Sequence, residues 1–237
     1  MKNTALPLLI AFFLFLNVDV RAQEKQYKVG IIGFYNLENL FDTINQPDVN
    51  DEEFTPNGSN LYTPQVYVDK LGKLEEVLSQ IGTDMSPDGL SVFGVAEIEN
   101  ESVLIDLVNQ PKLRNRNYKI VHYNSPDLRG IDVGLIYNPK YFKVTGSQSL
   151  NVPLMGDDGK PYATRDVLYV HGLYDGEPMH FFVNHWPSRR GGEEASAPSR
   201  KLAASVAKAK IDSIMKADPN AKVVLMGDLN DDPVSPS

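Results

Sequence analysis

Two carboxylates, three carboxamides and one imidazole stand where predicted buried strands end. They are Asn36, Glu97, Asn184, His185, Asp228 and Asn230. This set is rich in oxygen and contains no sulphur. It suits a hard cation, Mg²⁺ first, with Mn²⁺ or Ca²⁺ as alternatives, whereas zinc prefers more histidine or cysteine. A hydrated divalent ion beside carboxamide and imidazole donors fits phosphoryl chemistry, in which catalysis consists of positioning and charge stabilisation.

Short apolar runs predict the strands that would carry these residues. The predicted strands cover 28–36, 90–95, 118–123, 131–137, 141–152, 166–174, 179–183 and 221–226. Asp175-Gly176 between two of these runs indicates a hairpin turn. Apolar residues at helical spacing predict helices over 64–81, 101–109 and 199–216, the first with Thr63 as its N-cap.

Strands outnumber helices in this pattern, and two of the helices precede a buried strand. The pattern indicates an α/β or α+β fold with antiparallel strands included, built as layered sheets with helices outside. Strand ends in layered sheets converge on one edge, where crevices and sites usually lie. We therefore expect the polar strand-end residues to meet there. No internal repeat or linker divides the chain.

The composition excludes several classes of protein. The chain has 237 residues, ordinary globular proportions of apolar and charged residues, and a formal net charge of −8. That charge excludes a generally basic surface that coats nucleic acid, although it leaves room for a local basic cleft. The absence of cysteine excludes disulfides, thiolate nucleophiles and zinc–thiolate sites.

The first 22 residues have the pattern of a signal peptide. Lys2 precedes an apolar run from Ala5 to Leu16, which is too short to span a bilayer, and Ala22 ends a cleavage-like segment. The sequence thus predicts a signal peptide over 1–22 and one domain over 23–237. The protein would be secreted or periplasmic and without a stable membrane anchor. An uncleaved anchor or a buried N-terminal helix is the alternative.

Five motifs resemble the endonuclease/exonuclease/phosphatase superfamily of DNase I-like phosphodiesterases, and its secreted bacterial branch in particular. They are Phe34-Tyr35-Asn36-Leu37-Glu38-Asn39-Leu40-Phe41, Gly94-Val95-Ala96-Glu97-Ile98-Glu99-Asn100, Arg129-Gly130-Ile131-Asp132-Val133, Asn184-His185-Trp186-Pro187-Ser188-Arg189 and Gly227-Asp228-Leu229-Asn230-Asp231-Asp232-Pro233. Each motif alone is weak to moderate, but the five occur in the order of the family. The resemblance implies a two-sheet α/β sandwich with helices outside.

The resemblance also implies roles for individual residues. Glu97 would ligate the metal with help from Asn36, and Asp228 would orient and deprotonate the attacking water. Asn230 would donate hydrogen bonds to the phosphoryl oxygens. His185 would contact the phosphate or the leaving group.

Four arginines raise the question of phosphate binding. The resemblance also implies that Arg129 contacts phosphate. Arg189 and Arg190 precede Gly191-Gly192, so they form either a mobile phosphate-contacting loop or a solvated charge pair. Arg200, at the start of a predicted helix, is a further candidate that could point into the site.

One departure from the family pattern concerns the end of the chain. The family closes its site with a late Ser-Asp-His-type segment, yet no histidine follows His185. We therefore expect this chain to be a C-terminally truncated form of an active protein, in which the displayed residues bind metal poorly or are inactive. Evolved loss of the histidine is the alternative.

Three functions compete at this point. The leading hypothesis is a secreted metal-dependent nuclease that cleaves phosphodiester bonds by attack of water, with nucleic acid as its partner. The second is the same chemistry on a phospholipid head group, a nucleotide or another small phosphate ester. The third is a non-catalytic binding module on the same scaffold.

Overall fold

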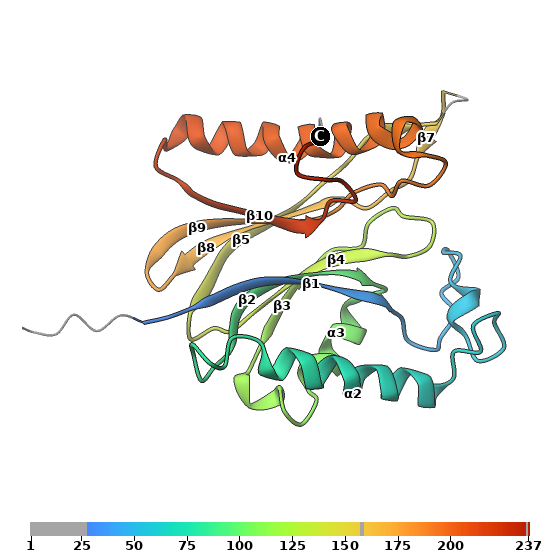
Figure 1. The fold of residues 1–237 in the computed structure, drawn as a ribbon, viewed down its shortest axis with the longest axis horizontal. Helices are drawn as coiled ribbons and strands as arrows, with labels where there is room; N and C mark the ends of the chain where they lie inside the picture. The colour runs from blue at the N-terminus through green and yellow to red at the C-terminus, as the bar shows by residue number, and fades with distance from the viewer. Residues whose placement is uncertain (1–27, 157–158, 236) are drawn as a thin grey trace, which may run out of the picture.

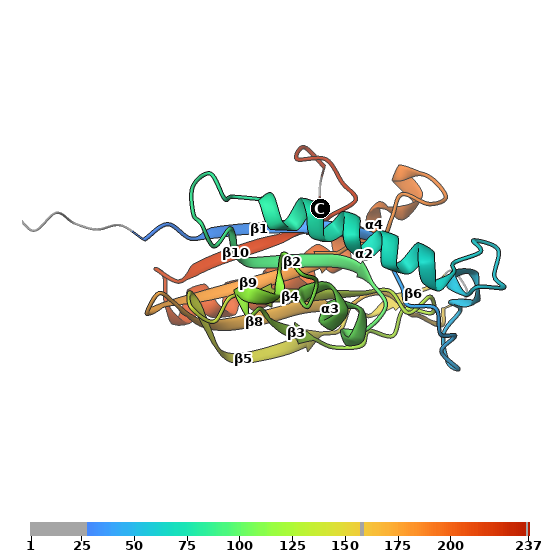
Figure 2. The same ribbon diagram turned by 90° about the horizontal axis from the view of Figure 1, so that it is seen from below.

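The computed structural model of the chain describes residues 28–156, 159–235 and 237. The predicted signal peptide over 1–22 lies outside these ranges. Figure 1 shows four layers, in which two β-sheets lie face to face and helices cover the outer face of each. Figure 2 shows the same layers from below, with helix α2 in front of the first sheet. None of the helices in the described ranges combines the length and the apolar character that a membrane span requires.

The first sheet has the strand order β1-β2-β4-β3. Its strands are β1 (Ile31–Leu40), β2 (Leu90–Ile98), β3 (Lys119–His122) and β4 (Asp132–Tyr137). Strand β1 is parallel to β2, and the other pairs are antiparallel. Helices α2 (Pro64–Gln80) and α3 (Glu101–Val108) pack on the outer face, and the short helices η1 (Glu52–Phe54) and η2 (Arg114–Arg116) lie in the connections.

The second sheet repeats this arrangement in the order β10-β9-β8-β5. Its strands are β5 (Phe142–Leu150), β8 (Val167–Tyr174), β9 (Glu177–His185) and β10 (Lys222–Asp228). Strand β10 is parallel to β9, and the other pairs are antiparallel. Helix α4 (Glu193–Ala217) covers the outer face, and a small ribbon of β6 (Leu154–Met155) and β7 (Pro161–Tyr162) stands beside the sheet.

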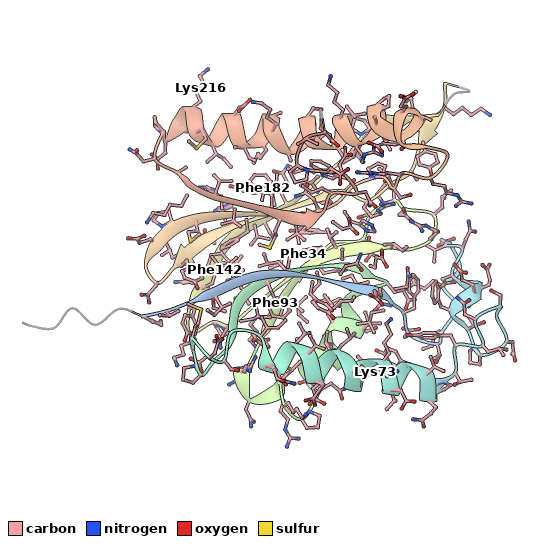
Figure 3. All side chains as sticks on the ribbon, viewed as in Figure 1. Phe34, Lys73, Phe93, Phe142, Phe182 and Lys216 are labelled. Atoms are coloured by element: carbon pink, nitrogen blue, oxygen red, sulfur yellow. The ribbon has the colours of Figure 1, made fainter. Side chains whose placement is uncertain are left out.

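Apolar side chains fill all three spaces between the four layers. Phe34 and Phe142 lie between the sheets, as Figure 3 shows, whereas Phe93 faces α2 and Phe182 faces α4. Burial of large apolar side chains on both faces of a sheet is the main stabilising contribution to such a sandwich. The packed layers hold the strand ends in fixed positions, which a site built on those ends requires.

The predicted elements agree with the structure in type and order. The Thr63 side chain accepts a hydrogen bond from the amide of Val66, so it caps α2 as expected. Asp175 and Gly176 both have positive φ and join β8 to β9 in the predicted hairpin. The fold is α/β with two mixed four-stranded sheets and helices outside, as predicted.

Helix α4 differs from its prediction because it begins at Glu193 rather than at Ser199. Pro198 lies inside the observed helix, where it lacks the amide donor that other residues have. The buried Arg200 side chain supports this first stretch instead: its Nη2 donates to the Glu193 carbonyl at 3.1 Å, and its Nη1 donates to Ser196 Oγ at 2.7 Å. The Arg200 side chain thus connects the second turn of the helix to its first turn.

Candidate active site

Glu97, His185 and Asp228 form the candidate metal cluster. Each offers one ligand atom, and these three atoms lie within 4.8 Å of one another. Glu97 ends a strand of the first sheet, while His185 and Asp228 are paired residues at the ends of β9 and β10 in the second. The cluster therefore bridges the two sheets at one edge of the sandwich, where the sequence placed it.

The backbone turns sharply to present Glu97. Its φ is 58°, in the left-handed region that a residue with a side chain rarely adopts. The β2–β4 register is irregular between Ala96 and Ile98, so Glu97 leaves the regular strand as an extra residue. Strained backbone of this kind persists only where the surrounding packing imposes it, and it occurs preferentially at functional sites.

Asn36 connects the carboxylates of the two sheets. Its Nδ2 donates to Glu97 Oε1 at 3.0 Å and to Asp228 Oδ2 at 3.1 Å. Its Oδ1 accepts the amide of Glu38 at 2.8 Å, which defines the orientation of the side-chain amide. In this orientation Asn36 positions the two carboxylates; to serve as the metal ligand that the sequence predicted, its amide would have to turn.

A close approach between β9 and β10 places Asp228. A Cβ atom on Gly227 would lie 2.2 Å from the backbone oxygen of Asn184, and the φ of Gly227 is 155°, so only glycine fits there. Asp228 Oδ1 then accepts the amide of Asn230 at 3.0 Å. Because Asn36 holds its other oxygen, the Asp228 carboxylate is fixed at both ends.

Asn230 holds the loop after β10. Its Nδ2 donates to the Trp186 carbonyl at 2.9 Å, and its backbone is left-handed with a φ of 51°. The predicted role of Asn230, donation to phosphoryl oxygens, would use the second hydrogen of the same amide. The structure brings Asn230 to the edge that carries the cluster.

His185 is buried and uncharged. Burial, followed by the charge of Arg165, lowers its pKa to about 3, so the imidazole is neutral near pH 7. Its Nε2 lies 3.8 Å from Glu97 Oε1, and its Nδ1 is buried without a hydrogen-bond partner among the described residues. A neutral imidazole with an available lone pair can ligate a divalent cation or accept a proton.

A buried arginine that the sequence reasoning missed supports the His185 backbone. Arg165 Nε donates to the carbonyl of His185 at 3.2 Å, and its Nη2 donates to that of Trp186 at 2.8 Å. Asp127 balances its charge through a 3.1 Å ion pair. An arginine two residues before the apolar run of β8 was the signal that could have identified it, because a charge buried at such a place requires partners.

The three arginines predicted to bind phosphate have different surroundings. The Arg129 side chain is about half exposed and lies 3.5 Å from Asp127. Arg189 bonds to the Asn230 carbonyl and pairs with Glu193, Asp231 and Asp232. Arg200 is fully buried and pairs with Asp231 at 2.9 Å. In this arrangement Arg189 and Arg200 anchor the loop after β10, and Arg129 remains open to solvent.

The donor set fits a divalent cation. The two carboxylates bring two negative charges to one point, next to a neutral imidazole. Within the described residues, no lysine or arginine forms an ion pair with Glu97 or Asp228. Oxygen-rich sites with one imidazole accept Mg²⁺ and Mn²⁺, and the imidazole favours Mn²⁺ somewhat more.

Comparisons with known proteins identify the family and the fold of the chain. Residues 31–237 match the model of the endonuclease/exonuclease/phosphatase family. No curated protein matches. The described fold is similar to an endonuclease/exonuclease/phosphatase family protein from Bacteroides thetaiotaomicron, with a TM-score of 0.54 and 20% identity over 86% of this chain and 64% of that one.

Two further solved structures share the fold. One is truncated TDP2 from Caenorhabditis elegans, with a TM-score of 0.51 and 20% identity over 70% of this chain and 58% of that one. The other is a mannosyl-6-phosphatase from B. thetaiotaomicron, with a TM-score of 0.52 and 16% identity over 84% and 64%. The chain thus spans about three fifths of the length of these structures. On the family match over residues 31–237, this chain belongs to the endonuclease/exonuclease/phosphatase family.

Proposed function

We propose that the protein is a divalent-metal-dependent hydrolase of phosphate esters, and that its substrate is nucleic acid. The observation that carries this proposal is the cluster of Glu97, His185 and Asp228, with ligand atoms within 4.8 Å of one another. When bound there, Mg²⁺ or Mn²⁺ would neutralise charge that builds on the phosphoryl oxygens. On the basis of the predicted signal peptide, the proposal also holds that the protein acts outside the cytoplasm.

The residues of the chain divide the chemistry between them. Asp228, held at both oxygens, orients a water molecule and takes its proton as the water oxygen attacks phosphorus. A new P–O bond forms, and the bond from phosphorus to the leaving oxygen breaks. Asn230 and the neutral His185 stand beside the developing charge, where a polar group raises the rate only if it is already in position.

The test is hydrolysis of bis(p-nitrophenyl) phosphate and of plasmid DNA by the purified protein with Mg²⁺ or Mn²⁺. We expect both substrates to be cleaved, and chelation by EDTA to stop both reactions. Cleavage of the small ester alone would overturn the nuclease assignment and leave a phosphodiesterase for small molecules. No metal-dependent cleavage of either substrate would overturn the proposal and favour a non-catalytic binding module.

The variants Glu97→Gln and Asp228→Asn connect the activity to the cluster. Each keeps the size of the side chain and removes one negative charge. We expect each to abolish hydrolysis while the melting temperature stays near that of the wild type. Normal turnover in either variant would remove that residue from the mechanism.

A further inference from the structure

A cavity of about 640 Å³ lies outside the metal cluster, and none of the three cluster residues lines it. Its walls come from the loop around residues 127–129, from the β6–β7 ribbon and from the segment over 187–199. Arg165 and Asp127 line the cavity; Arg165 also donates to the backbone carbonyls of His185 and Trp186, and Asp127 pairs with Arg165. Arg165 therefore connects the wall of the cavity to the backbone of a cluster residue.

One carboxylate organises the arginines at this wall. Asp127 Oδ2 pairs with the buried Arg165 at 3.1 Å, and its Oδ1 accepts the amide of Arg129 at 2.9 Å. The Arg129 guanidinium lies 3.5 Å from the same carboxylate and is half exposed. Among the described residues, the structure gives the exposed Arg190 no hydrogen-bond or ion-pair partner. Arg190 thus has no competing partner among the described residues, and Arg129 keeps an exposed guanidinium beside Asp127.

The charge of the cavity is opposite to that of the chain. Among the described residues, three arginines line it against the single carboxylate of Asp127, whereas the whole protein carries a formal charge of −8. An acidic protein that gathers arginines around one cavity attracts anions there and repels them elsewhere. Arginine matches phosphate oxygens with two parallel hydrogen bonds, which makes a phosphate group the best-fitting anion.

Apolar side chains stand next to these arginines. Leu128, Met155 and Tyr162 line the cavity, and each is between 57% and 61% exposed. Large apolar side chains gathered at a cavity mark a surface that a ligand covers. An aromatic ring beside guanidinium groups suits a flat organic group that carries a phosphate.

We propose that this cavity is a subsite for a second phosphate of the substrate and the flat group attached to it, as in the nucleotide next to the scissile phosphate. Arg129 and Arg190 bind the second phosphate, and Tyr162 packs against the flat group. The proposal rests on the function proposed above. It adds that the enzyme prefers substrates with two phosphates to substrates with one.

Two chromogenic substrates that differ by one phosphate test the proposal. They are thymidine 5′-(p-nitrophenyl phosphate) and the same compound with a 3′-phosphate. We expect the 3′-phosphate to raise kcat/KM about tenfold, which corresponds to about 1.4 kcal/mol of additional binding. Arg129→Gln and Arg190→Gln should each remove most of that preference, whereas Arg114→Gln on the distant helix η2 should keep it. An equal kcat/KM for both substrates in the wild type would overturn the subsite.

A binding experiment separates failure of the subsite from failure of the proposed function. Calorimetry in EDTA compares thymidine 3′,5′-bisphosphate, thymidine 5′-phosphate and fructose 1,6-bisphosphate. We expect the nucleoside bisphosphate to bind about tenfold more tightly than the other two, and Arg190→Gln and Tyr162→Ala to weaken it, even if no ester is hydrolysed. Equal binding of the sugar bisphosphate would overturn the role of Tyr162, and equal binding of the monophosphate would overturn the subsite itself.

Discussion

Asn36 and Asp228 lie 192 positions apart in the chain, and the Asn36 side-chain amide donates a 3.1 Å hydrogen bond to the Asp228 carboxylate. Because the same amide donates to Glu97, one neutral side chain joins the two sheets at the site. Without this donor, the negatively charged carboxylates of Glu97 and Asp228 would face each other without a shared hydrogen-bond donor.

Asn36→Ala is expected to weaken metal binding and hydrolysis about 10- to 100-fold, which is the usual cost of losing a residue that orients metal ligands. The melting temperature should change little, because few apolar contacts are lost. Mn²⁺ titration and the kcat for bis(p-nitrophenyl) phosphate measure the effect, and Asn115→Ala on the exposed connection before β3 is the control. Wild-type Mn²⁺ affinity in Asn36→Ala would contradict the positioning role.

At position 97, glycine should give a more stable protein than alanine, which is the reverse of the usual order inside a strand. Inside a strand glycine is less stable than alanine, but the φ of 58° at Glu97 strains any residue with a Cβ atom. We expect Glu97→Gly to exceed Glu97→Ala in free energy of unfolding by about 1 kcal/mol, although both are inactive. Urea denaturation measures the difference; a more stable alanine variant would show that the backbone there is relaxed.

Gly227→Ala should destabilise the protein by about 3 kcal/mol and also lower activity, because the new Cβ would meet the backbone of Asn184 at 2.2 Å. The matched control is Gly72→Ala in helix α2, where no atom lies within 4 Å of the added Cβ. That change should stabilise the protein by about 0.5–1 kcal/mol, since alanine is the better helix former. Equal effects of both changes on urea denaturation would contradict the close approach of β9 and β10.

Arg165→Met should cost about 3–5 kcal/mol of stability, because it leaves the buried Asp127 carboxylate without its partner. The double variant Arg165→Met with Asp127→Leu should recover part of that loss. Urea denaturation of the two single variants and the double variant completes the cycle. If the two stability losses simply add, Arg165 and Asp127 are not coupled, and other contacts hold the backbone of His185.

Arg200→Ala separates a structural role from the predicted phosphate contact. Because the guanidinium is buried among Asp231, Ser196 and Glu193, we expect lower stability, by about 2–4 kcal/mol, without a selective rise in KM. Thermal unfolding and steady-state kinetics of the folded fraction measure the two effects. An unchanged melting temperature with a raised KM would restore the phosphate contact.

Most of the fold could be predicted because its signals are local. The apolar run of β10 and the helical spacing after Thr63 depend only on neighbouring residues. Helix α4 begins at Glu193 rather than at the predicted Ser199, and the buried Arg200 side chain supports this early stretch through its bonds to Glu193 and Ser196. Local patterns do not reveal such a side-chain contribution.

The sequence predicted which residues meet at the site, but it did not predict how their side chains are oriented and paired. Strand ends indicated that Asn36, Glu97, His185 and Asp228 would meet. The orientation of the Asn36 amide, the buried pair of Arg165 and Asp127, and the burial of Arg200 all depend on contacts between distant segments. Sequence spacing alone carries no information on which arginine faces solvent and which is enclosed.

The most direct test of the account is Mn²⁺ binding by the purified protein, followed through the electron paramagnetic resonance signal of the free ion. We predict one Mn²⁺ ion per chain, displaced by Mg²⁺, and loss of this site in the double variant Glu97→Gln with Asp228→Asn while the fold remains intact. Unchanged Mn²⁺ binding in the folded double variant would contradict the claim that these two carboxylates form one metal site.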